Sequence, residues 1–358
     1  MESGRNFCNF LSSGLFITDK SDSSKNLNVK PCCYFKESTN FSDYTQTRES
    51  WKSITDWTDN CVHCSILENK KKDSYRNSAE SYYDPDNKIT MLEIDYSNLC
   101  NAACGICRPM NSNLIGKFLK QEGSNEIIAP TVSQKKFFDA IDQLDFSHIK
   151  TLRFRGGEPL IQQFHLKVLE KIKNKNAEIE YFTNGSNFPD EESWDTWKNF
   201  NVKLVFSIDG IGKKFEYIRT PLRWDQVSDN MNRIMNMGYS NFTYDISYTI
   251  NPLNLYYHHE IFKFFLNMRK RSSTFNIRMH HCFEEWGLEN TTPELREMFK
   301  KKYNSDFSVS KMLDELPFEE WKYTRFLNAI KVHEKRFNLN GAEVFPEIWD
   351  LAIKNQNL

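Results

Sequence analysis

The chain has 358 residues, of which 39% are hydrophobic and 27% are charged. This composition is typical of a globular protein and excludes a disordered or fibrous chain. Its 47 Lys and Arg residues nearly balance its 48 Asp and Glu residues, so we expect no binding to nucleic acid or to a membrane surface.

The first residues, MESGRNFCNFLSSG, have neither the basic start nor the apolar stretch of a secretory signal. No run approaches the roughly 18 apolar residues of a membrane span. We therefore expect a cytoplasmic protein, in which cysteines stay reduced and are better explained by metal or cluster ligation than by disulfides. The nine cysteines stand at positions 8, 32, 33, 61, 64, 100, 104, 107 and 282.

Residues 1–78 are polar, with only short apolar stretches, and contain five of the cysteines. A unit of this size buries too little surface to be comfortable alone, so a bound metal or cluster has a structural role available. Residues 79–88 are predicted to be a linker, because the segment is polar and contains a proline turn signal.

After the linker, short apolar runs alternate with segments of helical length. Strands are predicted at 89–95, 150–155, 178–183, 203–209, 242–250 and 274–280. Helices are predicted at 133–144, 164–175, 190–200, 224–237 and 258–271. Six strands alternating with helices predict an α/β fold with a parallel sheet and right-handed crossovers. Periodicity alone leaves an open sheet and a partial barrel as alternatives. Residues 286–358 are predicted to be a helical extension, with amphipathic runs at 292–303 and 317–337.

The segment LCNAACGICRP (99–109) directly follows the first of these strands. It places Cys100, Cys104 and Cys107 in a C-x3-C-x2-C arrangement. Three thiolates on one short loop suit an iron–sulfur cluster with one iron left open to another ligand. Structural zinc is the alternative, but it needs a fourth protein ligand and none is evident nearby.

Three further loops follow the next strands: GGEPL (156–160), TNGS (183–186) and SIDG (207–210). In this order, together with the cysteine loop, they resemble the radical S-adenosylmethionine (SAM) superfamily over residues 89–285. The resemblance implies a partial (βα)6 TIM-like barrel and a [4Fe-4S] cluster whose open iron binds SAM. Ile106 departs from the pattern, because members commonly have an aromatic residue before the last cysteine.

The residues themselves suit a charged ligand at the ends of the strands, where ligands gather in parallel α/β folds. Glu158 can supply a carboxylate to an ammonium group, and the fork of Arg219 suits a carboxylate, with a surface salt bridge as its alternative. For Asn251 a simple turn residue is the alternative. By resemblance, the residues that would bind SAM are Gly156, Gly157, Glu158, Thr183, Asn184, Ser207, Asp209, Arg219 and Asn251.

The N-terminal cysteines contain a C-x2-C pair, Cys61 and Cys64, which suits zinc and an auxiliary iron–sulfur cluster equally well. With Cys8, the PCC at 31–33 and Arg76 of SYR, the segment looks like a twitch domain, a shortened relative of the SPASM domain, here placed before the barrel. The resemblance implies a second [4Fe-4S] cluster on Cys8, Cys32, Cys61 and Cys64. Cys33 would face the opposite way on a strand and is a reserve thiol. The segment also contains Trp51, in the pattern W-x9-C-x2-C, and the pair Glu68 and Arg76.

Cys282 stands alone after the sixth strand, in RMHHCFEEW. A free cysteine is usually a small buried hydrophobe. The alternative is a catalytic hydrogen-atom donor to a substrate radical, as in radical SAM epimerases. His280, His281, Glu284 and Glu285 beside it form a candidate acid–base set, with a solvated strand end as the alternative.

The resemblance implies an enzyme that cleaves SAM reductively and abstracts hydrogen from a peptide or protein, leading to a crosslink, an oxidation or an epimerisation. Its reductant would be a protein such as flavodoxin or ferredoxin. One alternative is the same chemistry on a small alcohol, sugar or aminoglycoside-like substrate. Another is a non-catalytic binding protein held together by zinc.

Overall fold

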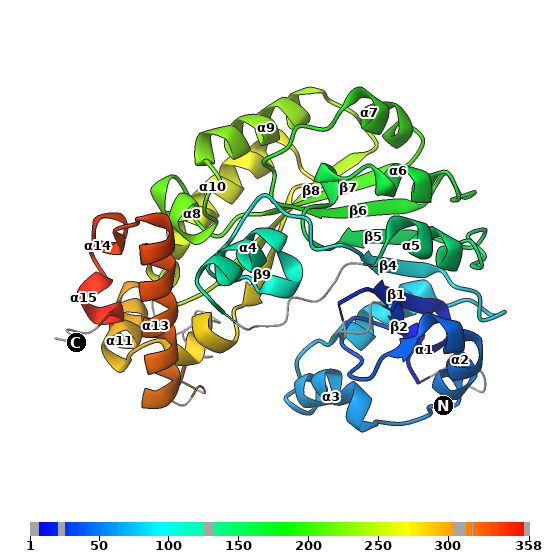
Figure 1. Cartoon of the computed structure of the whole chain (residues 1–358), viewed down its shortest axis with the longest axis horizontal. Coiled ribbons are helices and arrows are strands. Elements are labelled where there is room, and N and C mark those ends of the chain that lie inside the picture. The colour runs from blue at the N-terminus through cyan, green and yellow to red at the C-terminus, as the bar shows by residue number, and fades with distance from the viewer. Residues whose placement is uncertain are drawn as a thin grey trace.

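The computed structural model describes residues 7–20, 26–124, 132–303, 313, 314, 316 and 318–353. Its centre is a nine-stranded sheet in the order β3-β2-β1-β4-β5-β6-β7-β8-β9 (Figure 1). The strands are β1 (Gly14–Thr18), β2 (Asn28–Lys30), β3 (Thr39–Asn40), β4 (Met91–Asp95), β5 (Thr151–Arg155), β6 (Glu178–Thr183), β7 (Asn201–Ser207), β8 (Phe242–Ile250) and β9 (Asn276–His281).

The predicted α/β fold is confirmed. The six predicted strands correspond to β4–β9, which pair in parallel and in sequence order. Their ends differ from the predicted ones by at most two residues. The sheet does not close on itself, because β3 and β9 are its edge strands.

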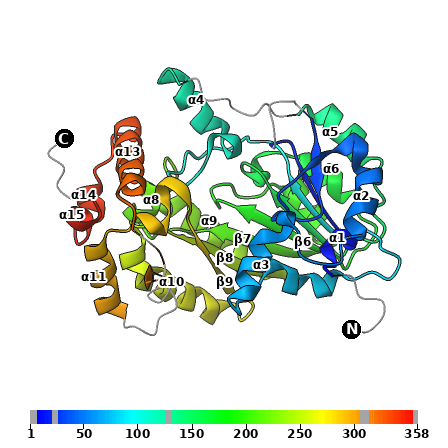
Figure 2. The ribbon, with the colours of Figure 1, turned by 90° about the horizontal axis from the view of Figure 1, so that it is seen from below.

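Some helices cover the sheet, and others lie beyond its two ends. They are α1 (Phe10–Ser13), α2 (Tyr44–Lys52), α3 (Val62–Asn69), α4 (Asn113–Gln121), α5 (Gln134–Ile141), α6 (Phe164–Leu169), α7 (Glu191–Trp197), α8 (Lys213–Ile218), α9 (Trp224–Asn236), α10 (His258–Arg271), α11 (Pro293–Tyr303), α13 (Glu320–Phe337), α14 (Gly341–Val344) and α15 (Trp349–Ala352). Figure 2 shows the C-terminal helices at one end of the molecule and α1–α3 at the other.

The two faces of the sheet differ in chemistry because side chains alternate along each strand. One face packs under the helices in the main core, through residues that include Leu92, Ile94, Leu152, Phe154, Ile179 and Leu204. The opposite face of the same strands bears ionised groups that pair with one another, among them Glu93, Arg153 and Glu180. We call this charged face the inner face of the sheet. The loops at the strand ends surround it.

The N-terminal segment differs from the expectation of a separate small unit, because it supplies three strands to the same sheet. β1 pairs in parallel with β4, from Gly14 beside Met91 to Thr18 beside Asp95. Beyond β1, the Lys20 ammonium contacts Asp95 Oδ1 at 2.5 Å and Asn111 Oδ1 at 3.2 Å. The start of the predicted linker lies in a 3-10 helix, Tyr75–Tyr82. The predicted boundaries of the linker, after residue 78 and after residue 88, stay a prediction.

Among the described residues, no helix is long and apolar enough to cross a membrane.

A buried polar network fixes β6 against the helices that cover it. The Tyr181 hydroxyl accepts a hydrogen bond from Trp197 Nε1 at 3.0 Å and lies 2.9 Å from His165 Nδ1. All three side chains are at most 2% exposed. Each therefore depends on the others for its hydrogen bonds.

We predict that Tyr181→Phe destabilises the protein by about 1–3 kcal/mol, because it leaves the Trp197 and His165 ring nitrogens without this partner. Urea unfolding measures the loss. Tyr83→Phe is the matched control, since Tyr83 is 41% exposed. Equal midpoints for the two variants would contradict the assigned role.

Candidate functional site

The loop that follows β4 contains the three barrel cysteines, and its backbone is held on both sides. The Ala103 and Gly105 N–H groups donate to the carbonyls of Thr220 at 2.7 Å and Ile218 at 2.9 Å. A Cβ at Gly105 would stand 2.3 Å from the Trp286 ring. Only glycine therefore fits between these neighbours without displacing the ring.

The three thiols of the loop interact with one another. Burial raises the pKa of Cys100 and Cys104 to about 12 and that of Cys107 to about 11, and each thiol is shifted further by another of the three. The Ala102 N–H donates to Cys100 Sγ at 3.4 Å, and Asn113 Oδ1 accepts from the Cys100 N–H at 3.0 Å. A buried thiol set with a backbone donor aimed at sulfur suits a ligand that keeps the thiols deprotonated.

The two glycines of GGEPL serve the cysteine loop itself. Gly157 N–H donates to the Ser97 carbonyl at 2.9 Å. A Cβ at Gly157 would lie 2.1 Å from the Leu99 carbonyl oxygen, and one at Gly156 would lie 2.6 Å from that of Tyr96. Gly156 also has a φ of +130°, which disfavours other residues. The glycines let the loop after β5 pack directly on the backbone after β4.

Glu158 connects this loop to the next one. Its carboxylate is buried and accepts hydrogen bonds from Thr183 Oγ1 at 2.7 Å, the Asn184 N–H at 2.7 Å and the Leu160 N–H at 3.2 Å. Burial raises the pKa of Glu158 to about 7, although these donors oppose the shift. Three of the residues predicted to bind SAM, Glu158, Thr183 and Asn184, therefore lie in one hydrogen-bonded group.

Asn101, which the sequence analysis did not single out, joins that group to the cysteine loop. Asn184 Nδ2 donates to Asn101 Oδ1 at 2.9 Å, and Asn101 Nδ2 donates to Ser186 Oγ at 2.8 Å. Ser186 Oγ in turn donates to Asn184 Oδ1 at 2.6 Å. Only its place beside Cys100 pointed to this role.

Asp209 and Arg219 form a buried ion pair near the thiols. Arg219 Nε donates to Asp209 Oδ2 at 2.6 Å, and Asp209 Oδ1 accepts from the Thr249 N–H at 2.7 Å. Burial raises the pKa of Asp209, and Arg219 opposes this. Arg219 also interacts electrostatically with Cys104 and Cys107. The surface salt bridge that was the alternative for Arg219 is therefore wrong, because the pair is buried beside the cysteine loop.

The two remaining predicted SAM contacts stand at the next strand ends. Ser207 is half-buried and is the last residue of β7. Asn251 is fully buried, and its Oδ1 accepts from the N–H groups of Leu253 at 3.0 Å and Asn254 at 3.2 Å. This is an Asx turn, so Asn251 shapes the loop after β8.

Cys282 lies close to the barrel cysteines. A cavity of about 220 Å³ is lined by the cysteine-loop residues 105–108 and by residues 281–286, so that Cys107 and Cys282 share it. Cys282 is 7% exposed and belongs to an apolar cluster with Trp286 and the C-terminal helices. Arg108 and Glu284 form an ion pair between the two segments. Cys282 is therefore buried, as expected of a cysteine that only packs. It also faces the predicted SAM and cluster site.

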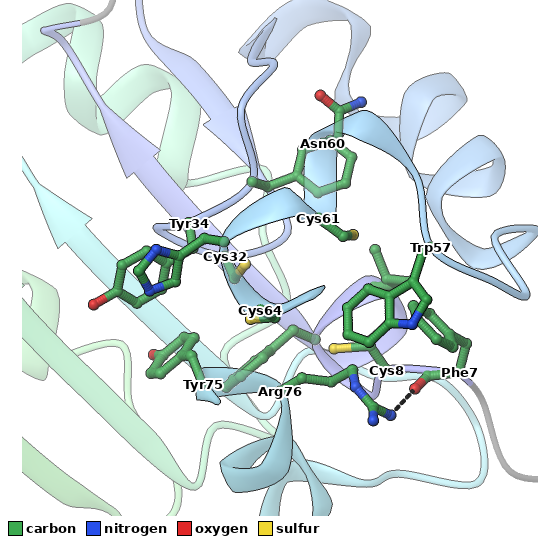
Figure 3. A pocket seen from close by; sticks show the side chains of 14 residues that line it. Phe7, Cys8, Cys32, Tyr34, Trp57, Asn60, Cys61, Cys64, Tyr75 and Arg76 are labelled. Atoms are coloured by element: carbon green, nitrogen blue, oxygen red, sulfur yellow. Dashed lines mark hydrogen bonds between the residues drawn. The ribbon is translucent and has the colours of Figure 1, made fainter. Parts of the chain in front are cut away.

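The four N-terminal cysteines predicted to act together line one cavity (Figure 3). The cavity is small, about 20 Å³, and its lining contains Cys8, Cys32, Cys61 and Cys64. Burial raises the pKa of Cys8 to about 12, and the thiols of Cys64 and Cys61 add to the shift. Cys33 is not among the lining residues; it interacts instead with Glu93 and Arg155 of the inner face. The thiols of the consecutive residues Cys32 and Cys33 thus lie on opposite sides of the segment.

Arg76 forms one wall of this cavity. Its guanidinium lies 5.1 Å from the Phe7 ring and 5.2 Å from the Trp57 ring, and its Nε donates to Glu68 Oε1 at 3.0 Å. This accounts for the pair Glu68 and Arg76 noted in the sequence. The tryptophan of the cavity is Trp57; Trp51, which the sequence pattern included, is buried in the main core.

No three His, Cys, Asp or Glu side chains in the described part of the chain are placed to hold a single metal ion. A four-iron cubane takes one thiolate at each ligated iron, so its ligands need not converge on one point. Three thiols on a loop and four around a cavity, all buried or half-buried, are donor sets of this kind.

No family model matches the chain. Over 125 residues the sequence is 30% identical to GTP 3',8-cyclase of Desulforamulus reducens; the match covers 34% of this chain and 35% of that protein. The chain thus aligns with about a third of the length of this curated relative.

Two groups of solved structures are similar over part of the chain. The structure of polyhistidine-tagged anSMEcpe with bound AdoMet has a TM-score of 0.43 and 17% identity, over 65% of this chain and 61% of that chain. Streptococcus suis SuiB bound to precursor peptide SuiA has a TM-score of 0.40 and 13% identity, over 73% of this chain and 57% of that chain.

The loops that carry the resemblance follow successive strands of the sheet. In the parallel sheet, the cysteine loop, GGEPL, TNGS and SIDG come after four successive strands, β4 to β7. The structure brings the first three of them into direct backbone and side-chain contact. The chain is similar in sequence to the cyclase over about a third of its length, and these loops are the ones that carry its resemblance to the radical SAM superfamily.

Proposed function

We propose that this chain is an enzyme in which Cys100, Cys104 and Cys107 hold a [4Fe-4S] cluster that binds SAM. When bound, the cluster supplies the electron that cleaves SAM and so produces the radical that abstracts hydrogen from a substrate. The observation that supports this most is the contact of the cysteine loop with the GGEPL segment at the ends of parallel strands.

The residues around the thiols have distinct tasks in this proposal. The thiols bind the cluster, and Gly105 together with Trp286 fixes the loop. Glu158 aligns the loops after β5 and β6. The Arg219 guanidinium lies near two of the thiols, where a cation stabilises negative charge. Burial of the site keeps water away from reactive species.

The proposed substrate is a peptide or protein, and the proposed electron donor is a small reductant protein such as flavodoxin or ferredoxin. Support for the peptide comes from the N-terminal cavity, whose four thiols match the set that the twitch resemblance implies. In this proposal Cys8, Cys32, Cys61 and Cys64 hold an auxiliary [4Fe-4S] cluster. All four of its ligand positions are then filled by protein.

We predict that replacing Cys100, Cys104 and Cys107 together by Ala abolishes reductive SAM cleavage, because no other described thiols stand on this loop. The measurement is 5'-deoxyadenosine formed with dithionite after anaerobic reconstitution. Cys33→Ser is the control and should retain cleavage. Product formation by the triple variant would refute the assignment.

The auxiliary cluster predicts about eight irons per chain, from two cubanes. Cys32→Ser should lower this to about four, because it removes one of the thiols that line the cavity. The matched variant Cys33→Ser should keep the full content, since its thiol lies on the inner face. Iron, sulfide and zinc analyses measure the outcome. About four irons with one zinc in the wild-type protein would favour a structural zinc site instead.

Cys282 is proposed to return the hydrogen atom of its S–H group to the substrate radical, which epimerisation requires. The sulfur radical left on Cys282 would then take one electron from the proposed reductant protein and one proton from solvent. Its cavity is shared with Cys107. With a known substrate, Cys282→Ala should still consume SAM but should no longer place solvent deuterium at the reacting carbon. Mass spectrometry of the product in D2O measures this. Unchanged deuterium incorporation would leave Cys282 with its packing role alone.

A further inference from the structure

The inner face of the sheet contains a network of ion pairs that crosses five strands. Arg155 Nε lies 2.8 Å from Glu93 Oε1. Arg278 pairs with Asp245 at 2.6 Å and with Glu180, and Arg153 also pairs with Glu180. Three arginines thus face three carboxylates, and the network is neutral as a whole.

The charges of this network are nevertheless layered. The side chains of Glu93 and Glu180 are each 1% exposed and that of Asp245 is 5% exposed. The side chain of Arg155 is 39% exposed and that of Arg278 is 28% exposed. The carboxylates are therefore buried against the strands, and the guanidinium groups form the surface that water reaches.

Both of these half-buried arginines lie over one aromatic ring. The guanidinium carbon of Arg155 is 4.2 Å from the centre of the Phe182 ring, and that of Arg278 is 5.6 Å from it. Nε of Arg155 and Nε of Arg278 face the buried acids. Each guanidinium thus contacts a buried carboxylate with one edge and the Phe182 ring with one face. These two contacts fix its orientation, so its remaining N–H groups point in a fixed direction.

His280 of β9 is the third side chain of this layer. Burial lowers the pKa of His280 to about 4, and the positive charges of Arg155 and Arg278 lower it further. With this pKa, His280 is neutral at neutral pH, so it can offer a ring N–H group to an anion but no charge.

We propose that Arg155, Arg278 and His280 form an anion-binding subsite that holds a carboxylate of the substrate on the inner face of the sheet. Arg155 directly precedes the GGEPL segment, so a carboxylate bound there lies on the side of the fold where the cysteine loop is anchored. The inference rests on the proposed function for its substrate, a peptide with an acidic side chain or a free C-terminus. The fork geometry of the arginines suits the two oxygens of such a group.

Calorimetric titration of the reconstituted, SAM-loaded protein tests the subsite without a known substrate. The probes are acetylated and amidated triglutamate, the isosteric triglutamine, and inorganic phosphate. We expect triglutamate to bind and triglutamine not to bind. Arg155→Gln should weaken triglutamate binding about tenfold or more, because one charge-assisted interaction is lost.

Arg233→Gln is the matched control, since Arg233 lies 3.9 Å above the Phe188 ring but on helix α9. It should bind triglutamate like the wild type. Arg155→Lys, which keeps the charge near Glu93, separates loss of the subsite from loss of the fold, and should retain part of the affinity while melting at the wild-type temperature.

Three outcomes would overturn the proposal. They are equal binding of triglutamate and triglutamine, equal losses in Arg155→Gln and Arg233→Gln, and binding of phosphate without binding of triglutamate. The titration reports on the anion alone, while cluster content and 5'-deoxyadenosine report on the proposed function. Failure of one is therefore distinguishable from failure of the other.

Discussion

The close approach of two backbones, at Gly157 and Leu99, is the constraint on which the site depends. The loop after β5 packs against the loop after β4 with no room for a side chain between them. That approach brings Glu158 within reach of Thr183 and Asn184. The same contact positions the start of the cysteine loop. The loops after β4, β5 and β6 are therefore held in place by one contact.

The N-terminal segment is part of the same framework. β1 extends the parallel sheet beyond β4, and Lys20 at its end contacts Asp95 of β4 and Asn111 after the cysteine loop. Hydrogen bonding between strands is stiff, because a shift in register would break every bond of the ladder. The two sets of cysteines are therefore held by one continuous sheet.

The sequence was sufficient for features that depend on local pattern. The strands β4–β9 are short apolar runs separated by helical lengths, and the four loops that carry the radical SAM resemblance follow four of these strands directly. Features that depend on distant partners could not be read in the same way. β1 looks like any short apolar stretch, and its place beside β4 is set by tertiary pairing. Likewise, nothing in the local sequence shows that Asp209 is the partner of Arg219, or that Asn101 bonds to Asn184.

The packing of Trp286 against Gly105 has a mechanical consequence. The Trp286 ring lies edge to face with Phe326 and with His333 of α13, at 6.0 and 5.7 Å between ring centres. Helix α13 thus contacts the indole ring of Trp286, and the indole ring contacts Gly105 of the cysteine loop. A displacement of α13 would be transmitted through the ring to the spacing of the thiols on either side of Gly105. The end of the polypeptide therefore helps to set the geometry of a loop near its beginning.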